Sequence, residues 1–234
     1  MALLSLLAGS SGRLAVPLDG LILDVDPAVA PRFTLVGSEV SAYAYTGSEG
    51  PLTLAPTNSG TRLTRSLATT INGRPTLTLT SAALRDLWTN QDIGLGSGDP
   101  HAIFAVCTMA APTAAFASIG VVGQSGALSS TYLGMLSTLT WIAGAGGAGG
   151  TQTAWTQTGT MVPTMTLDSS PKLNIFVDGR FANASATFSP ALATGGGIRA
   201  ADGFFLPGDA NLARLLIYSG NPDRTKLTRI LKSL

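Results

Sequence analysis

Apolar and polar residues alternate with a period of two over most of this chain, from about residue 33 onward. Successive side chains of a β-strand point to opposite faces of a sheet, so this is the period of half-buried strands. The segments are rich in Thr, Val, Ile and aromatic residues, and Gly, Pro, Asn or Ser clusters separate them. The predicted strands are FTLV, SEVSAYAYT, PTLTLTS, HAIFAVCTM, AFASIGVVG, TYLGMLSTLTWIA, TQTAWTQTG, KLNIFVDG, RFANASATF and ANLARLLIYSG.

The pair Asp178-Gly179 lies between two of these apolar runs. Both central residues of a two-residue hairpin can need positive φ, which Asp tolerates and Gly prefers, so a hairpin is predicted here. Strand and turn together recur about every ten residues, which is typical of sandwiches and jelly rolls. The predicted fold is all-β: a jelly-roll sandwich of two antiparallel sheets packed face to face. The expected central strands are AIFAVCTMA, LNIFVDG and ARLLIYSG.

Few helices are expected. The chain has only two glutamates and three lysines, the residues that favour exposed helices. Residues 81–90 could form one or two turns. The better prediction is a short C-terminal helix with Asn221 as its cap, Pro222 at its first position and Asp223 near the positive end of its dipole. Its apolar face would consist of Leu227, Ile230, Leu231 and Leu234.

The charge of the chain is low and balanced. Charged residues make up 12% of the sequence and the net charge is +1, without any basic run. Nucleic-acid binding by phosphate neutralisation is therefore not expected. No segment is long and apolar enough for membrane insertion. A surface with so little charge suggests that neighbouring proteins cover part of it.

We expect one domain over residues 21–234, preceded by an N-terminal arm over residues 1–20. The arm begins MALLSLLAGSSG, an apolar run that is short and lacks a preceding basic residue. These features argue against a secretory signal peptide. An apolar arm of this kind could dock on the domain itself or on a partner.

Catalytic and metal-binding residues are not predicted. His101 and Cys107 are the only histidine and cysteine, too few for a hydrolase triad or a zinc site. Cys107 lies in an apolar run and is expected to be a small buried side chain. Asp24 and Asp26 alternate on one strand and so face the same way, which would suit a cation or joint acid–base action. The other interpretation is that they are solvent-facing or turn residues.

Two further patterns bear on catalysis or cofactor binding. Glu39 and Glu49 lie in turn-rich sequence and do not form a recognisable pair for glycoside hydrolysis. Gly144, Gly146 and Gly149 match the spacing of a dinucleotide-binding loop, but that site needs a helix next, and TQTAWTQTGT is not helical. No cofactor is therefore predicted, and the glycines are expected to form a loop between strands.

Three aromatic residues lie in neighbouring predicted strands and are the candidate ligand-binding residues: Trp141, Trp155 and Tyr132. Exposed on a sheet, their rings could stack on sugar rings. Buried, they would fill the core instead. The sequence leaves both alternatives open.

The order of signals resembles the concanavalin A-like lectin/glucanase superfamily, in particular its laminin-G-like branch. The similar elements are a "vDG" hairpin at residues 177–179, a glycine-led strand ending near "iYs" at residues 208–218, and a terminal helix at residues 221–234. Residues 71–75, INGRP, resemble another segment of that branch, and HAIFAVCTM resembles a third. The Glu-x-Asp-x-x-Glu signature of the glucanases is missing. The resemblance covers roughly residues 20–234 and implies a domain without catalytic activity.

The function expected from this resemblance is binding or structure. A stand-alone domain, poor in charge and carrying an apolar arm, favours a structural protein of a virus particle, such as a decoration, fibre or tail protein of a tailed phage. It would be located in the virion, contact other virion proteins, form homo-oligomers and attach to a cell-surface glycan. The alternative is a carbohydrate-binding lectin module. A third, less favoured alternative is a glycan hydrolase with an unfamiliar site.

Overall fold

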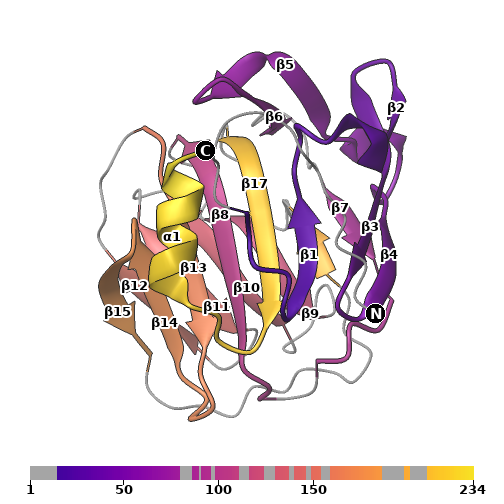
Figure 1. Ribbon diagram of the computed structural model, residues 1–234. Coiled ribbons are helices and arrows are strands. Elements are labelled where there is room, and N and C mark those ends of the chain that lie inside the picture. The colour runs from indigo at the N-terminus through magenta and orange to yellow at the C-terminus, as the bar shows by residue number, and fades with distance from the viewer. Residues whose placement is uncertain are drawn as a thin grey trace.

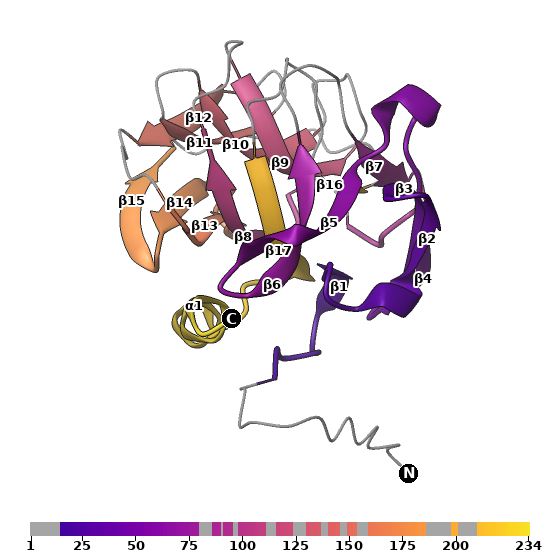
Figure 2. The same cartoon turned by 90° about the horizontal axis from the view of Figure 1, so that it is seen from above.

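The chain folds as two antiparallel β-sheets packed face to face, with one helix on the outer side of the larger sheet (Figures 1 and 2). The predicted all-β sandwich with a short C-terminal helix is thus confirmed. The computed structural model describes residues 15–79, 86–89, 91–95, 98–110, 116–123, 130–136, 140–145, 149–153, 159–185, 198–200 and 210–234. Residues 1–14, most of the predicted arm, lie outside this set.

The larger sheet has eleven strands in the order β15-β14-β13-β8-β17-β6-β5-β3-β2, with β1 paired to β17 and β4 to β3. All described pairings are antiparallel, as in hairpin-built sandwiches. Its strands are β1 (Leu21–Val25), β2 (Phe33–Val36), β3 (Glu39–Gly47), β4 (Gly50–Leu54), β5 (Thr64–Ile71), β6 (Arg74–Leu79), β8 (His101–Met109), β13 (Pro163–Leu167), β14 (Leu173–Val177), β15 (Arg180–Ala184) and β17 (Ala210–Ser219).

The smaller sheet has six strands in the order β12-β11-β10-β9-β16-β7. They are β7 (Leu87–Thr89), β9 (Phe116–Gly123), β10 (Ser130–Leu136), β11 (Trp141–Ala145), β12 (Gly149–Thr153) and β16 (Ile198–Ala200). Short 3₁₀ turns at Ala30–Arg32 and Ser59–Thr61 connect strands of the larger sheet.

Three strand predictions need correction. The run TYLGMLSTLTWIA is two strands, β10 and β11, which pair with each other as a hairpin. Residues 87–89, predicted as part of a helical turn, form strand β7, because they pair with β16 and Trp88 also forms an isolated bridge with Ala55, the residue after β4. Strand β14 lies next to the edge strand β15, so it is not central, whereas β8 and β17 are.

The predicted hairpin at Asp178-Gly179 is confirmed. These residues have φ of 54° and 81° and join β14 to β15. Asn72-Gly73, with φ of 51° and 76°, makes the same kind of turn between β5 and β6. The Asp178 carboxylate also accepts a hydrogen bond from the Val162 N–H (2.9 Å), which ties the turn to β13.

Helix α1 (Arg224–Lys232) docks on this same hairpin. Arg224 donates to the Gly179 carbonyl (2.7 Å) and lies 3.7 Å from the centroid of the Phe176 ring, while Lys232 pairs with Asp178 at 3.6 Å. The predicted apolar face of α1 is confirmed, because Leu227, Ile230, Leu231 and Leu234 are all buried. The hairpin and the terminal helix therefore form one packing unit, although about forty residues separate them.

The cap of α1 differs from the predicted one. Asp223 accepts a hydrogen bond from the Lys226 N–H (3.0 Å) and is the N-cap, whereas Asn221 lies outside the helix. An ionised carboxylate both satisfies a free N–H and favours the positive end of the helix dipole, so the helix begins after Asp223.

The hydrophobic core lies between the two sheets. Ile103 and Leu215 of the larger sheet point inward, and a side chain at Gly120 of β9 would meet both of them. Phe104 and Tyr218 point to the opposite, outer face, where they form an edge-to-face pair with ring centroids 6.0 Å apart. Tyr218 there donates to the Pro17 carbonyl (2.8 Å), which holds the chain entering β1. Strands β8 and β17 are thus buried on both faces.

Candidate functional site

A single row of residues crosses the smaller sheet from β11 to β7. Backbone pairing places Gly144, Tyr132, Val121, Arg199 and Trp88 directly opposite one another in that order. Directly paired residues share a face of an antiparallel sheet, so the row lies on one face. We call it the cross-sheet row.

The cross-sheet row lies on the outer face of the smaller sheet. The neighbours of its members along the strands, Leu133, Val122 and Ala143, belong to the hydrophobic core between the sheets. Val121 and Ile142 are also buried, at 4% and 8% exposed, but are not part of that core. Because strand side chains alternate, Tyr132, Val121 and Trp88 point away from the larger sheet.

Tyr132 lies against the backbone of Gly144. A Cβ atom at Gly144 would come within 2.1 Å of Cζ of Tyr132, so only glycine leaves room for the ring there. The hydroxyl-bearing end of the ring therefore lies over the Gly144 backbone, and the side chain is still partly exposed. Burial raises the pKa of the Tyr132 phenol above its ordinary value, so the hydroxyl stays neutral near pH 7. A neutral, partly exposed ring lying on a sheet is the kind of surface on which a sugar ring can stack.

Trp88 occupies the other end of the cross-sheet row and is also partly exposed. Its strand β7 is only three residues long, and mutual backbone hydrogen bonds of 2.9 Å with Ala55 hold it against the larger sheet. Sequence analysis did not select Trp88, because the surrounding segment was interpreted as helical. A strand of three residues is too short to show a period of two, so no signal in the sequence pointed to Trp88.

The three aromatic residues predicted to bind a ligand differ in their positions in the structure. Trp141 is fully buried in the core between the sheets, so its ring is not available to a ligand. The reason is strand parity: Trp141 and Ala143 point inward while Ile142 and Gly144 point outward. Trp155 lies outside the described residues. Tyr132 is partly exposed on the outer face of the smaller sheet, so a ligand could contact it; its ligand-binding role stays a prediction.

Substituting Gly144 with alanine tests the placement of Tyr132. The added methyl group would overlap the tyrosine ring, and because Tyr132 is a rotatable side chain we expect the ring to swing away while the sheet stays folded. The exposed fraction of Tyr132 should increase, measurable as faster chemical modification of its phenol. Ser48→Ala, a small substitution in a turn of the larger sheet, is the control. Unchanged reactivity of Tyr132 in Gly144→Ala would contradict the described contact.

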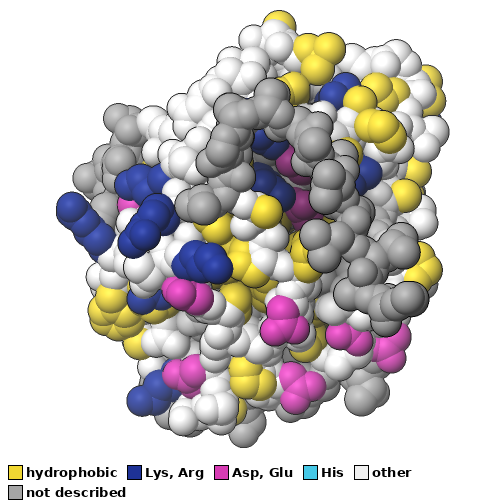
Figure 3. Space-filling model, viewed as in Figure 1, with side chains coloured by type: hydrophobic (Ala, Val, Ile, Leu, Met, Phe, Trp, Pro, Cys, Tyr) yellow, Lys and Arg dark blue, Asp and Glu magenta, His cyan; other side chains and the backbone are white. Residues whose placement is uncertain are grey.

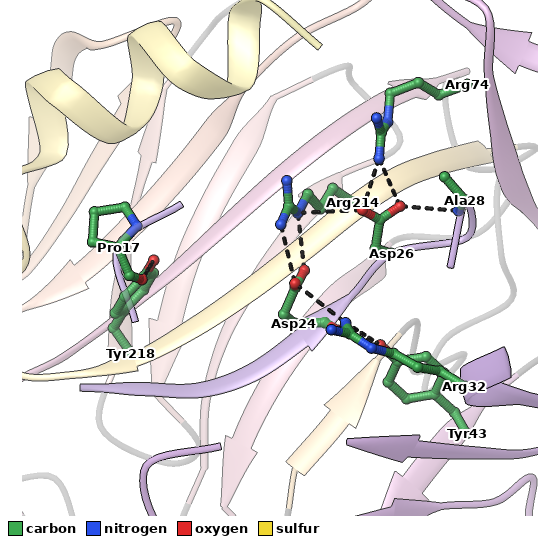
Figure 4. A network of polar contacts seen from close by, with 9 residues as sticks. All are labelled: Pro17, Asp24, Asp26, Ala28, Arg32, Tyr43, Arg74, Arg214 and Tyr218. Carbon is green, nitrogen blue, oxygen red and sulfur yellow. Dashed lines mark hydrogen bonds and ion pairs between the residues drawn. The ribbon is translucent and has the colours of Figure 1, made fainter. Parts of the chain in front are cut away.

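Asp24 and Asp26 lie on the outer face of the larger sheet and are paired with arginines (Figure 4). Asp24 accepts two hydrogen bonds from Arg214, of 2.9 and 3.0 Å, and one of 3.3 Å from Arg32. Asp26 accepts from Arg74 at 2.7 and 2.8 Å. The prediction that the two carboxylates face the same way is confirmed, since Arg214 also lies 3.9 Å from Asp26. They are not solvent-facing: both are nearly buried.

This pairing determines what the two carboxylates can do. Burial alone would lower the pKa of Arg214, but the hydrogen bonds and charge of Asp24 outweigh it and the pKa is raised. The cation thus stays beside Asp24 over the whole accessible pH range. A carboxylate occupied by guanidinium groups is poorly placed to hold a metal ion or to act as a general base.

His101, Cys107 and Glu39 are either buried or held in an ion pair within the fold. Burial lowers the pKa of His101 to about 4, and its Nε2 lies 2.6 Å from the Thr131 hydroxyl of the opposite sheet. Cys107 is fully buried, as predicted, and burial raises the pKa of its thiol to about 12. Glu39 forms an ion pair with Arg62 at 3.7 Å. Within the described ranges there is no group of three or more His, Cys, Asp or Glu residues that could hold a metal ion.

No protein-family model matches the sequence, and no curated protein is significantly similar to it. The described part of the chain contains no helix long and apolar enough to cross a bilayer. What this chain is similar to therefore comes from solved structures.

Three solved structures share the fold. Domain 4 of AbnA, a GH43 extracellular arabinanase from Geobacillus stearothermophilus, in complex with arabinotriose, matches with a TM-score of 0.57 and 12% identity over 83% of this chain and 98% of that one. The binding domain of botulinum neurotoxin serotype G matches with a TM-score of 0.54 and 10% identity over 81% and 50%. Botulinum neurotoxin type C, whose cell entry depends upon interaction with two ganglioside molecules, gives 0.53 and 10% over 84% and 51%.

This likeness shows the β-sandwich fold. The identities are too low to show more than the fold, and this chain spans only about half the length of the two toxin structures. The sandwich is compatible with the concanavalin A-like resemblance. The laminin-G-like branch and a phage origin stay predictions.

Proposed function

We propose that this protein is a non-catalytic carbohydrate-binding module whose ligand contacts the outer face of the smaller sheet. The observation that carries the proposal is the placement of Tyr132, with the hydroxyl-bearing end of its ring over Gly144 and part of the side chain exposed. Trp88 adds a second partly exposed aromatic side chain in the same cross-sheet row. Such rings can cover the apolar face of a sugar.

The fold likeness supports this proposal without carrying it. One similar structure holds arabinotriose, and another belongs to a toxin that depends upon gangliosides. Two of the similar structures cover binding regions rather than catalytic domains. Fold alone does not determine function, so the argument depends on the side chains of this chain.

The arginine pairing of Asp24 and Asp26, the two carboxylates considered for joint acid–base action, supports a non-catalytic role. A glycoside hydrolase needs one carboxyl group free to give a proton and another free to attack or to activate water. Asp24 and Asp26 each accept hydrogen bonds from an arginine, and both lie on the larger sheet, away from the cross-sheet row.

Replacing Tyr132 with alanine is expected to weaken glycan binding about three- to tenfold, the amount that the loss of one aromatic stacking contact corresponds to. The ligand is first identified on a glycan array, and its affinity is then measured by titration calorimetry. Trp88→Ala should weaken binding by a similar factor. Phe181→Ala is the matched control, because Phe181 is 60% exposed but lies on β15 of the other sheet.

Two results would overturn the proposal. One is a wild-type protein that binds nothing on an array containing neutral and acidic glycans. The other is equal affinity of the wild type, Tyr132→Ala and Trp88→Ala, with all three folded by circular dichroism.

The second proposal is a structural protein of a virus particle. It is favoured by apolar side chains exposed on β2 and β5, with Val36 54% and Leu67 65% exposed. Contiguous exposed apolar surface is what marks protein contacts. Assembly into homo-oligomers, or co-sedimentation with phage particles, would support this role. A chain that stays monomeric and joins no particle would count against it.

A further inference from the structure

Charged side chains gather on the outer face of the larger sheet, beside helix α1. The space-filling view shows Lys and Arg side chains beside Asp and Glu side chains near the middle of this face (Figure 3). The side chains of Arg74 and Arg214 are 13% and 12% exposed, and that of Arg32 is 31% exposed. We call these three residues the arginine cluster.

Three separate chain segments build the arginine cluster. Arg32 ends a 3₁₀ turn, Arg74 begins β6, and Arg214 lies in β17. The register of β17 against β8 shifts between Leu212 and Arg214, which is a β-bulge. Without the bulge, strand alternation would turn Arg214 toward the core, so the bulge places its guanidinium on the outer face.

The arginine cluster has more positive charge than its partners neutralise. Three guanidinium groups face the carboxylates of Asp24 and Asp26, which leaves a net charge of +1. Both carboxylates already accept hydrogen bonds from several donors. Asp24 accepts hydrogen bonds from Arg214 and Arg32, and Asp26 accepts hydrogen bonds from Arg74 and the Ala28 N–H. The excess therefore lies on the arginines.

The arginines also have hydrogen-bond donors to spare. Arg214 bonds through Nε and Nη2, Arg74 through Nη2, and Arg32 through Nη1. In the described part of the chain one Nη group of each has no acceptor, and Nε of Arg74 is buried without a partner. Each guanidinium carries five N–H donors in a planar fork, and leaving a buried donor unsatisfied is unfavourable. The arginine cluster thus has both unused donors and an excess positive charge.

We propose that the arginine cluster binds an oxyanion, that is, a carboxylate, sulfate or phosphate group. Two oxygens of such a group match the fork of a guanidinium, and hydrogen bonds between ionised partners are the strong ones. The site is separate from the cross-sheet row, which lies on the other sheet. Its ligand could be a free anion or the acidic group of a sugar, and the experiment distinguishes these sources.

The test measures anion binding to the full chain at constant ionic strength. Sodium sulfate and sodium phosphate are titrated against a sodium chloride reference, and sodium glucuronate is compared with glucose, by calorimetry and by the midpoint of thermal unfolding. We expect saturable binding of at least one oxyanion and a higher midpoint than in chloride. Binding of glucuronate but not glucose assigns an acidic sugar; binding of the inorganic ions alone assigns a free anion. No saturable binding of any oxyanion overturns the proposal.

Arg32→Gln is the decisive variant. Arg32 is the most exposed member of the cluster, and Asp24 keeps both hydrogen bonds to Arg214 without it, so the fold should survive. We expect at least about fivefold weaker anion binding, as for the loss of one charge-assisted hydrogen bond. Arg229→Gln, which removes the same charge from an exposed position of α1, should bind like the wild type.

Equal weakening in Arg32→Gln and Arg229→Gln would mean that only the overall charge matters, and would overturn the assignment. Arg74→Lys gives an independent check, since a lysine keeps the charge beside Asp26 but loses the fork. We expect weaker anion binding with the unfolding midpoint in chloride little changed. Glycan binding at Tyr132 is measured in the same variants, so failure of one site leaves the other testable.

Discussion

Replacing Arg214 with leucine should lower the free energy of unfolding by about 3–5 kcal/mol, the usual cost of removing one partner of a buried ion pair. The Asp24 side chain is only 8% exposed, and without Arg214 it keeps a single bond of 3.3 Å to Arg32. An uncompensated carboxylate would remain where water hardly reaches it. Urea unfolding at pH 7 measures the change.

The double variant Arg214→Leu/Asp24→Asn tests the reason for this loss. If the loss of stability comes from the unpaired Asp24 carboxylate, removing that charge should restore part of the stability. The double variant should then be more stable, by about 1.5 kcal/mol or more, than the sum of the two single changes in unfolding free energy predicts. Lys232→Leu is the control: its ion pair with Asp178 is at 3.6 Å, but the lysine side chain is 52% exposed, so the change should be under about 1 kcal/mol. A loss below about 1 kcal/mol in Arg214→Leu would show that the pair does not stabilise the fold.

The second large effect is loss of stability in mild acid through His101. Burial lowers the pKa of His101 to about 4 in the folded protein, against an ordinary value near 6.5 in the unfolded chain. Between these values the unfolded chain binds more protons, so stability present above pH 6.5 is lost as the pH falls toward 4. The full contribution is about 3 kcal/mol. Among the described charges, only Asp99 acts appreciably on His101, and it opposes the shift weakly.

His101→Gln separates this effect from general acid unfolding. Nδ1 of His101 faces the Asp99 carbonyl at 2.9 Å, so it is the nitrogen that donates, and Nε2 accepts from Thr131. Glutamine can bond the same partners but does not titrate in this range. Its unfolding free energy should therefore fall less between pH 6.5 and pH 4 than that of the wild type. Identical pH dependence of the two proteins would exclude a neutral buried His101 as the cause.

Local sequence was a good guide to turns and strand bounds. HAIFAVCTM corresponds to β8 from its first to its last residue, and Asp178-Gly179 forms the predicted turn. Both depend on neighbours in the chain: backbone conformations open to Asp and Gly, and alternation within one strand. The terminal helix shows the limit. Its apolar face was correct, but its cap lies at Asp223, two positions after Asn221, because either polar residue could start the helix.

The candidate sites were much harder to find in the sequence. Trp141 and Trp88 are both aromatic residues in strands, yet one fills the core and the other reaches solvent. A period of two divides a strand into two faces without saying which face is inward, and β7 is too short to show the period. Trp88 is recognised as a candidate site residue only because β16 pairs with both β7 and β9 and so places Trp88 in the same row as Tyr132.

The alternating pattern and the turn residues by themselves determined that this chain forms an antiparallel β-sandwich with a short terminal helix, because those signals act between near neighbours. Only the tertiary structure decided that Arg32, Arg74 and Arg214 meet around Asp24 and Asp26. The five residues come from segments up to 190 positions apart. A bulge in β17 turns one of them outward, and such a shift depends on the register with β8 rather than on the residues of β17 alone.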